Sequence, residues 1–216
     1  MHVEKSSGEA PDRAPESGLR DRLVQAGVEL VTAEGADALS LREIARRAGV
    51  SHGAPRRYFP THLELLSAIA RRGFTDLGDR AAAALGENGG EGGGENGGED
   101  RSTDARDRLG TLGRVYLDFA LANPGMYALM FRHDLLRSDE LGLRDTSLPL
   151  FGVLVDLVGQ ARPSANARLV AGALWANLHG IAQLWIWGSL QLATGAADFE
   201  PLLRTALDAH LGQVER

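Results

Sequence analysis

Residues 40–59 read SLREIARRAGVSHGAPRRYF, and this stretch decides how the first part of the chain folds. Ser40 and Glu43 have the spacing of a capping box, in which each side chain bonds a free amide at the start of a helix. Gly49 is placed to end that helix in a tight turn. In between, apolar residues recur with helical spacing, at Leu41, Ile44, Ala45 and Ala48.

A second helix is expected after the turn, with Ser51 as its N-cap and Pro55 in its first turn, where a missing amide costs least. Two short helices around a glycine turn are the pattern of a helix-turn-helix, whose second helix enters the DNA major groove. Small residues there permit close approach, and Arg56 and Arg57 can reach a phosphate or a guanine edge. Short helical hairpins are common, so a purely structural pair stays an open alternative.

Positive charge is concentrated in this part of the chain. The 216 residues carry a formal net charge of −6, yet residues 41–72 contain seven arginines and only two glutamates. Residues 86–104 carry one basic and six acidic side chains, which accounts for most of the acidity. A basic patch attracts phosphate whatever the global charge, although a solvated, salt-bridged helix face would have the same composition.

Helical periodicity continues on both sides of this stretch, and no segment alternates as a strand does. We therefore predict an all-α fold. A polar connection is expected at residues 132–146, and one long helix at 165–192. The predicted parts are a disordered tail at 1–16, the DNA-binding domain at 17–77, an acidic glycine-rich linker at 86–104, and a regulatory and dimerisation domain at 105–216.

Composition argues against several other classes of protein. The chain has no cysteine, which excludes disulfides and thiolate chemistry and fits a reducing cytosol. The first residues have no apolar signal-peptide core, so we expect a cytoplasmic protein. The six histidines are scattered, without metal-binding spacing, and we expect no catalytic residue, metal or cofactor. An α-helical enzyme remains the alternative from another class and would require substrate turnover.

Residues 169–197 contain no charged side chain. A run of this length can span a membrane or form the centre of a bundle, and the polar residues Asn177, His179 and Gln183 favour the bundle. Small residues four apart let another helix pack closely, as in a helical dimer. The predicted homodimer interface, contributed by this helix and the last one, contains Gly172, Ala176, Gly180, Leu203 and Leu207.

A cluster of aromatic and thioether side chains is predicted to line a pocket for a small apolar or amphipathic effector. Apolar walls with a few polar groups are typical of such sites, and His179 is the best candidate for a polar contact. Plain core packing explains the same residues, and a satisfied buried histidine is the commoner case. The candidates are Met126, Tyr127, Met130, Phe131, Trp175, His179 and Trp185.

The stretch LSLREIARRAGVSHGAPRRYFPTHLELLSAIA resembles the DNA-binding domain of TetR-type transcriptional regulators over about residues 17–77. The segment WANLHG at 175–180, with NPGMYALMF at 123–131, is similar to the C-terminal domain of a subgroup with a Trp…His-Gly signature. The resemblance implies a three-helix DNA-binding head and a larger helical body for ligand binding and dimerisation. It also implies a homodimer that binds a near-palindromic double-stranded operator. It usually implies a repressor that leaves DNA when a small molecule binds; a DNA-binding regulator without an effector is the milder alternative.

The resemblance also assigns roles within residues 40–62. Ser51 matches the cap of the recognition helix, and Tyr58 the aromatic residue that contacts phosphate. Ala54-Pro55-Arg56 departs from the common Thr-Leu-Tyr, and His62 stands where the family often has lysine. The residues expected at DNA are Ser40, Arg42, Ser51, His52, Gly53, Ala54, Arg56, Arg57, Tyr58, Thr61 and His62.

Overall fold

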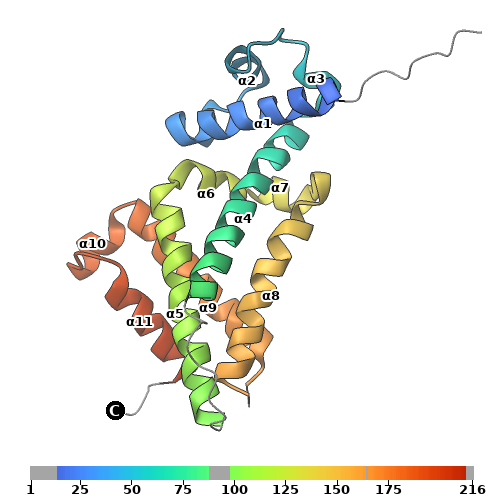
Figure 1. The fold of residues 1–216 in the computed structure, drawn as a ribbon. Helices are drawn as coiled ribbons and strands as arrows, with labels where there is room; N and C mark the ends of the chain where they lie inside the picture. Colours follow the sequence, from blue (N-terminus) through green and yellow to red (C-terminus); the bar gives the residue numbers. More distant parts are fainter. Residues whose placement is uncertain (1–13, 88–97, 164, 213–216) are drawn as a thin grey trace, which may run out of the picture.

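A small helical head sits at one end of an elongated helical body (Figure 1). The computed structural model describes residues 14–87, 98–163 and 165–212, and all regular elements within these ranges are helices, which confirms the all-α prediction. The head consists of α1 (Ala14–Glu34), the 3-10 turn η1 (Ala36–Ala38), α2 (Leu41–Arg47) and α3 (Pro55–Tyr58).

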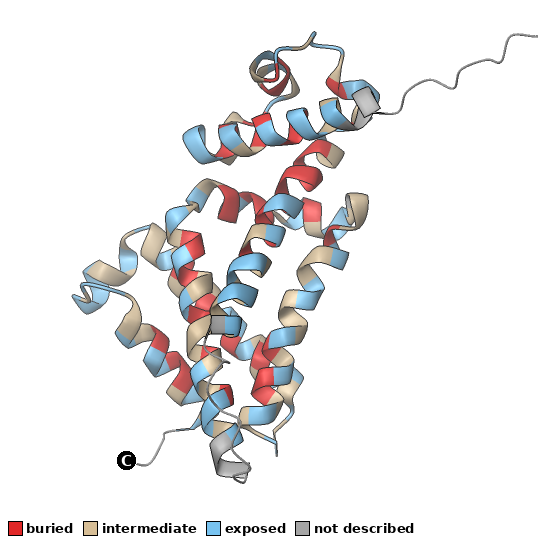
Figure 2. Ribbon diagram, viewed as in Figure 1, coloured by how far each residue is buried: buried red, intermediate tan, exposed pale blue. Residues whose placement is uncertain are grey.

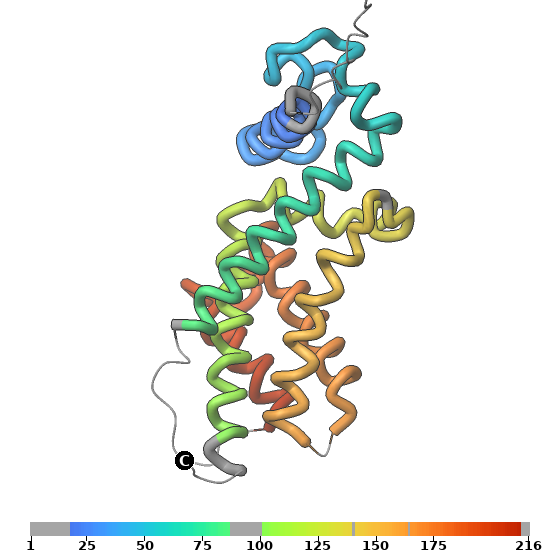
Figure 3. Tube along the Cα trace, turned by 45° about the vertical axis from the view of Figure 1, so that its right-hand side comes forward, coloured from blue at the N-terminus to red at the C-terminus, as the bar shows by residue number. Residues whose placement is uncertain are grey.

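The body is a bundle entered by the long helix α4 (His62–Glu87), which starts in the head and runs down beside the other helices (Figure 3). Its other long helices are α5 (Gly98–Ala122), α8 (Leu143–Ala161), α9 (Ala167–Ile186) and α11 (Glu200–Leu211). Shorter segments connect them: α6 (Pro124–Met130), α7 (His133–Ser138), η2 (Glu140–Gly142) and α10 (Ser189–Thr194).

Two clusters of buried side chains hold these parts together (Figure 2). The first contains the head residues Leu23, Ile44 and Phe59 and continues without a break into Phe119 and Met130 of the upper body. The second lies lower, between α5, α8, α9 and α11. The head is therefore packed on the body through a shared core, with α4 as the common element.

Five expectations about elements need correction. Ser51 is not a helix cap, because residues 51–54 form a turn and α3 begins only at Pro55. Residues 98–104 of the predicted linker are the start of α5, and the predicted connection at 132–146 is mostly helical. The expected helix at 165–192 breaks at Gly188, whose φ of 76° is left-handed. Residues 14–16 are helical, whereas 1–13 and 88–97 lie outside the described residues.

Candidate DNA-binding face, head–body joint and effector core

Capping and ion pairs fix helix α2 in the head. The Ser40 hydroxyl accepts a hydrogen bond from the Glu43 amide at 3.2 Å, which confirms the first half of the predicted box. Arg46 and Arg47 both donate to the Glu43 carboxylate, and together they lower its pKa to about 2. Arg47 also pairs with Glu34 at the end of α1. These two arginines are therefore neutralised within the head and serve its structure.

The other three arginines of residues 40–59 have no partner among the described residues. Arg42, Arg56 and Arg57 are exposed and make no hydrogen bond or ion pair with any residue that the structure describes. Beneath them, Pro55 and Phe59 are buried, and the Arg20 guanidinium lies 4.9 Å from the centre of the Phe59 ring. The one-turn helix α3 thus has an anchored inner side and an outer side that carries unpaired positive charge.

The other predicted DNA contacts lie around this outer side. Thr61 accepts a hydrogen bond from the Glu64 amide at 3.1 Å and so caps the start of α4. Burial lowers the pKa of His62, the Leu39 carbonyl partly offsets this, and the Arg132 guanidinium of the body lowers it further. His62 therefore faces the junction with the body as well as solvent. Ala54 and Tyr58 are half-buried, whereas the exposed members are Ser40, Ser51, His52, Gly53, Thr61 and His62.

Head and body meet where α1, α4 and α6 pack pairwise at three glycines. A Cβ on Gly27 of α1 would collide with Ile69 of α4, and one on Gly73 of α4 would lie 2.6 Å from the Met130 sulfur of α6. A Cβ on Gly125 of α6 would collide with the Val31 carbonyl of α1, a backbone atom that has no rotamer to change. A side chain at Gly27 or Gly73 would require Ile69 or the methionines to move, whereas one at Gly125 would require the backbone itself to shift. We call Gly27, Gly73 and Gly125 the glycine joint.

The polar centre of the body is a triangle of three side chains. The hydroxyl oxygens of Tyr116 and Tyr127 lie 2.9 and 2.7 Å from His179 Nδ1 and 3.1 Å from each other. Burial raises the pKa of Tyr127 to about 12 and also raises that of Tyr116, while it lowers the pKa of His179. All three groups are therefore uncharged at neutral pH, and they tie α5, α6 and α9 together.

Aromatic rings surround this triangle. Phe131 is the hub, with ring centres 4.8 Å from His179, 5.0 Å from Tyr127 and 6.1 Å from Trp175. Trp175 is 38% exposed, so it connects the cluster with the surface. We call the set the effector core: Phe74, Tyr116, Tyr127, Phe131, Phe151, Trp175 and His179.

The structure does not bring all the predicted pocket residues together. Met126 and Met130 pack against Gly73 in the joint, and Trp185 lies against Phe199, 6.4 Å between ring centres. Phe74, Tyr116 and Phe151 of the effector core were not among the predicted residues. Their partners are remote in sequence, so no local pattern singles them out.

One side of α9 is apolar and open to solvent. A Cβ on Gly172 or Gly180 would meet nothing within 4 Å, and Ala176 between them is exposed. Leu169 is 71% exposed and Trp187 is 66% exposed on the same helix and its end. By length and hydropathy α9 resembles a membrane span, but it packs against α5, α8, α10 and α11. We call this side the α9 face.

The predicted contribution of the last helix to the dimer interface needs correction. Leu203 is 1% exposed and Leu207 is 8% exposed, so both belong to the core of a single protomer. A Cβ on Gly113 of α5 would lie 2.6 Å from Leu203 Cδ1, which shows how closely α11 packs on α5. The sequence analysis placed Leu203 and Leu207 on the side of α11 that faces a second protomer. They lie instead on the side that faces α5 of the same protomer.

A helix-turn-helix head on a helical body with an apolar outer helix defines a one-component DNA-binding regulator. Residues 23–69 match the family described as bacterial regulatory proteins, tetR family, and residues 109–210 match the tetracyclin repressor-like C-terminal domain. The chain belongs to this TetR family, whose members are transcriptional regulators that bind DNA operators and small molecules and act as dimers.

Similar proteins support the assignment over most of the chain. The HTH-type transcriptional activator FasR of Mycolicibacterium smegmatis is 25% identical over 210 residues, 90% of each chain. The HTH-type transcriptional regulator BetI of Stenotrophomonas maltophilia is 28% identical over 181 residues, 83% of this chain and 86% of the relative. A solved structure, a protein with unknown function from Rhodococcus sp. RHA1, has a TM-score of 0.70 at 28% identity and covers 90% of this chain and 96% of that one.

Proposed function

We propose that this regulator is a homodimeric repressor that binds a near-palindromic operator and leaves it when a small molecule enters the effector core. The observation that carries the proposal is the division of charge in the head. Arg46 and Arg47 are neutralised by glutamates, while Arg42, Arg56 and Arg57 remain exposed and unpaired. Unpaired arginines on a helix-turn-helix attract phosphate and read guanine edges.

The docking follows from where these side chains lie. Arg56 and Arg57 on α3 face the major groove, where small Gly53 and Ala54 allow close approach. Ser40 and Thr61 sit at helix starts on either side and place hydroxyls near the phosphate backbone, as does Tyr58. Ser51 and His52 complete the contacts from the turn.

Dimerisation through the α9 face presents two heads to DNA. Its small residues Gly172, Ala176 and Gly180 allow a second copy of α9 to approach closely, and Leu169 and Trp187 supply apolar area at its two ends. Identical surfaces of this kind pair about a two-fold axis. Two symmetric heads engage half-sites about one helical turn of DNA, roughly 34–36 Å, apart.

The effector acts on the hydrogen bonds of the core. Because Tyr116, Tyr127 and His179 satisfy one another, an entering molecule must exchange at least one of these bonds for its own. We infer an apolar or amphipathic effector, since neutral rings line the core. Breaking the triangle loosens α6 from α5 and α9, and α6 meets the head at Gly125. The effector changes DNA affinity only through different affinities for the two arrangements.

The test is fluorescence anisotropy with DNA that flanks the protein's own gene, at several salt concentrations. Tight binding to a near-palindromic site with a steep salt dependence is expected, because phosphate contacts release counterions. Binding that is weak on every sequence would contradict the docking. Loss of transcription from that site on deletion of the gene, rather than a gain, would contradict the repressor assignment.

A further inference from the structure

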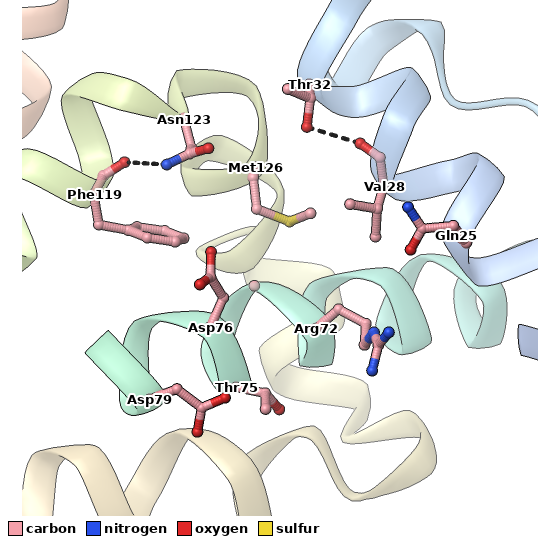
Figure 4. A pocket seen from close by; sticks show the side chains of 11 residues that line it. Gln25, Val28, Thr32, Arg72, Thr75, Asp76, Asp79, Phe119, Asn123 and Met126 are labelled. Carbon is pink, nitrogen blue, oxygen red and sulfur yellow. Dashed lines mark hydrogen bonds between the residues drawn. The ribbon is translucent and has the colours of Figure 1, made fainter. Parts of the chain in front are cut away.

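A pocket lies beside the glycine joint, separate from the effector core. It has a volume of about 300 Å³ and is open to solvent on one side. Helix α1 supplies one wall and α4 the floor, and the end of α5 and the start of α6 close the other side (Figure 4). Its walls therefore belong to both head and body, and Gly73 and Met126 are part of its lining.

The polar atoms at this pocket are mainly acceptors. Asn123 uses its amide nitrogen to donate to the Phe119 carbonyl, which turns its oxygen toward the pocket (Figure 4). Gln25 donates its amide nitrogen to Glu29, and Thr32 donates its hydroxyl to the Val28 carbonyl. A molecule that enters would consequently have to bring its own donors.

Negative charge and an aromatic ring lie at the same place. The Asp76 carboxylate points from α4 into the space between Phe119 and Met126 (Figure 4). The Arg80 guanidinium already binds this carboxylate at 2.9 and 3.0 Å and lies 5.5 Å from the centre of the Phe119 ring. The Arg80 guanidinium thus shows that a positively charged group can bind here in two ways, to the Asp76 carboxylate and to the Phe119 ring.

The rim adds further charges. Asp79 is exposed one turn beyond Asp76 and makes no ion pair or hydrogen bond with the described residues, and Arg72 stands at the opposite end. Arg80 neutralises Asp76, so Asp79 is the carboxylate of the lining that has no cationic partner among the described residues. The Phe119 ring, Val28 and the Met126 thioether complete it with apolar surface.

We propose that this junction pocket binds a small organic cation, an ammonium group carried on an aromatic or aliphatic body. The ammonium group replaces the half-exposed Arg80 guanidinium on the Asp76 carboxylate, an exchange that costs little because exposed ion pairs are weak. It also donates to the Asn123 oxygen, and its apolar part lies between Phe119, Met126 and Val28. A volume of about 300 Å³ accommodates such a molecule. Binding at this second site does not depend on the effector core or on the sign of regulation.

The test is isothermal titration of the full-length protein with 2-phenylethylammonium chloride. A Kd on the order of 1 mM is expected for a ligand of this size. The uncharged 2-phenylethanol and the anionic 3-phenylpropionate have similar shapes and should bind more weakly by about tenfold or more, because they lack the charge-assisted donor. Equal affinity for all three compounds would overturn the proposal.

Variants then locate the site. Asp76→Asn should weaken binding of the ammonium probe by about tenfold or more, and Thr32→Phe should abolish it by filling the pocket from the exposed face of α1. Asp118→Asn removes the same charge from an exposed position of α5 outside the lining and should leave binding unchanged. Trp175→Ala alters the effector core. Loss of binding in Trp175→Ala together with normal binding in Asp76→Asn would place the probe in the effector core and overturn the proposal.

Discussion

The head and the body of this regulator use polar groups in opposite ways. In the head, Arg42, Arg56 and Arg57 are exposed and have no partner in the part of the chain that the structure describes, so they can meet phosphates without rearrangement. In the body, Tyr116, Tyr127 and His179 already satisfy one another. The head's task is thus visible in the structure at rest, whereas the body's task requires that existing bonds be exchanged. The glycine joint connects the two and is the place where one can influence the other.

The largest effect is expected from a variant that separates the two protomers and leaves the head intact. Ala176→Glu places two carboxylates against each other across the two-fold axis of the α9 face, and like charges at an interface cost several kcal/mol. We expect a monomer by size-exclusion chromatography with light scattering, and weak binding to the full operator. Ala83→Glu, at an exposed position of α4, is the matched control and should remain a dimer. A stable dimer of Ala176→Glu would move the interface elsewhere.

The next prediction breaks the head and leaves the body intact. Arg56→Ala with Arg57→Ala should weaken operator binding about 100-fold, since each arginine contact contributes about 1–3 kcal/mol. Anisotropy titration measures the loss, and thermal unfolding should be unchanged because neither side chain has a partner within the described residues. Arg46→Ala with Arg47→Ala removes the same two charges from residues already paired with Glu43 and should weaken operator binding less. Equal losses would show that only net charge matters.

A third prediction acts on the joint between the two regions. Gly125→Ala forces a methyl group against the Val31 carbonyl and should lower the free energy of unfolding by about 1–3 kcal/mol. Gly152→Ala is the control, because a Cβ there meets nothing within 4 Å and alanine is the better helix former. Chemical denaturation compares the two variants. If Gly125→Ala were as stable as the wild type, α1 and α6 would not need their close approach.

The head was far easier to predict from the sequence than the body. Its capping residues, Ser40 and Thr61, act within three residues of their partners, so a local pattern finds them. The exception is α3, where Pro55 has no N–H to extend a helix back toward Ser51, and the helix starts one turn late. Which arginines are free was not predictable, because Arg47 is neutralised by Glu34, thirteen residues away.

In the body, the sequence gives the helices but not their orientation. The heptad-like stripes at Leu203 and Leu207 are the same whether they face a neighbouring helix or a second protomer, and only packing on α5 decides. Tyr116 and His179 are 63 residues apart, so their hydrogen bond has no sequence signature. The glycine joint was also missed, since a glycine inside a helix does not reveal which atom approaches it.

The smallest expected effect is on the pH dependence of the unfolding free energy. It involves one histidine from each region, His62 and His179. His62 and His179 both have lowered pKa values in the folded protein, chiefly through burial, while the unfolded chain keeps the ordinary value of about 6.5. As the pH falls below about 6.5, the unfolded state therefore binds more protons, and stability is lost down through the folded pKa values. Each histidine contributes at most about 1.4 kcal/mol per pH unit to this slope.

Two variants separate the contributions. His179→Gln should flatten the fall in unfolding free energy below about pH 6.5, because an amide oxygen can still accept from the Tyr127 hydroxyl but takes up no proton. His62→Gln should remove a similar share, and its effect should depend on Arg132, since that guanidinium also lowers the pKa of His62. Denaturant titrations at a series of pH values measure both slopes. A wild-type slope in His179→Gln would mean that the pKa of this histidine is the same in the folded and unfolded states, so that burial among the tyrosines does not disfavour its charged form.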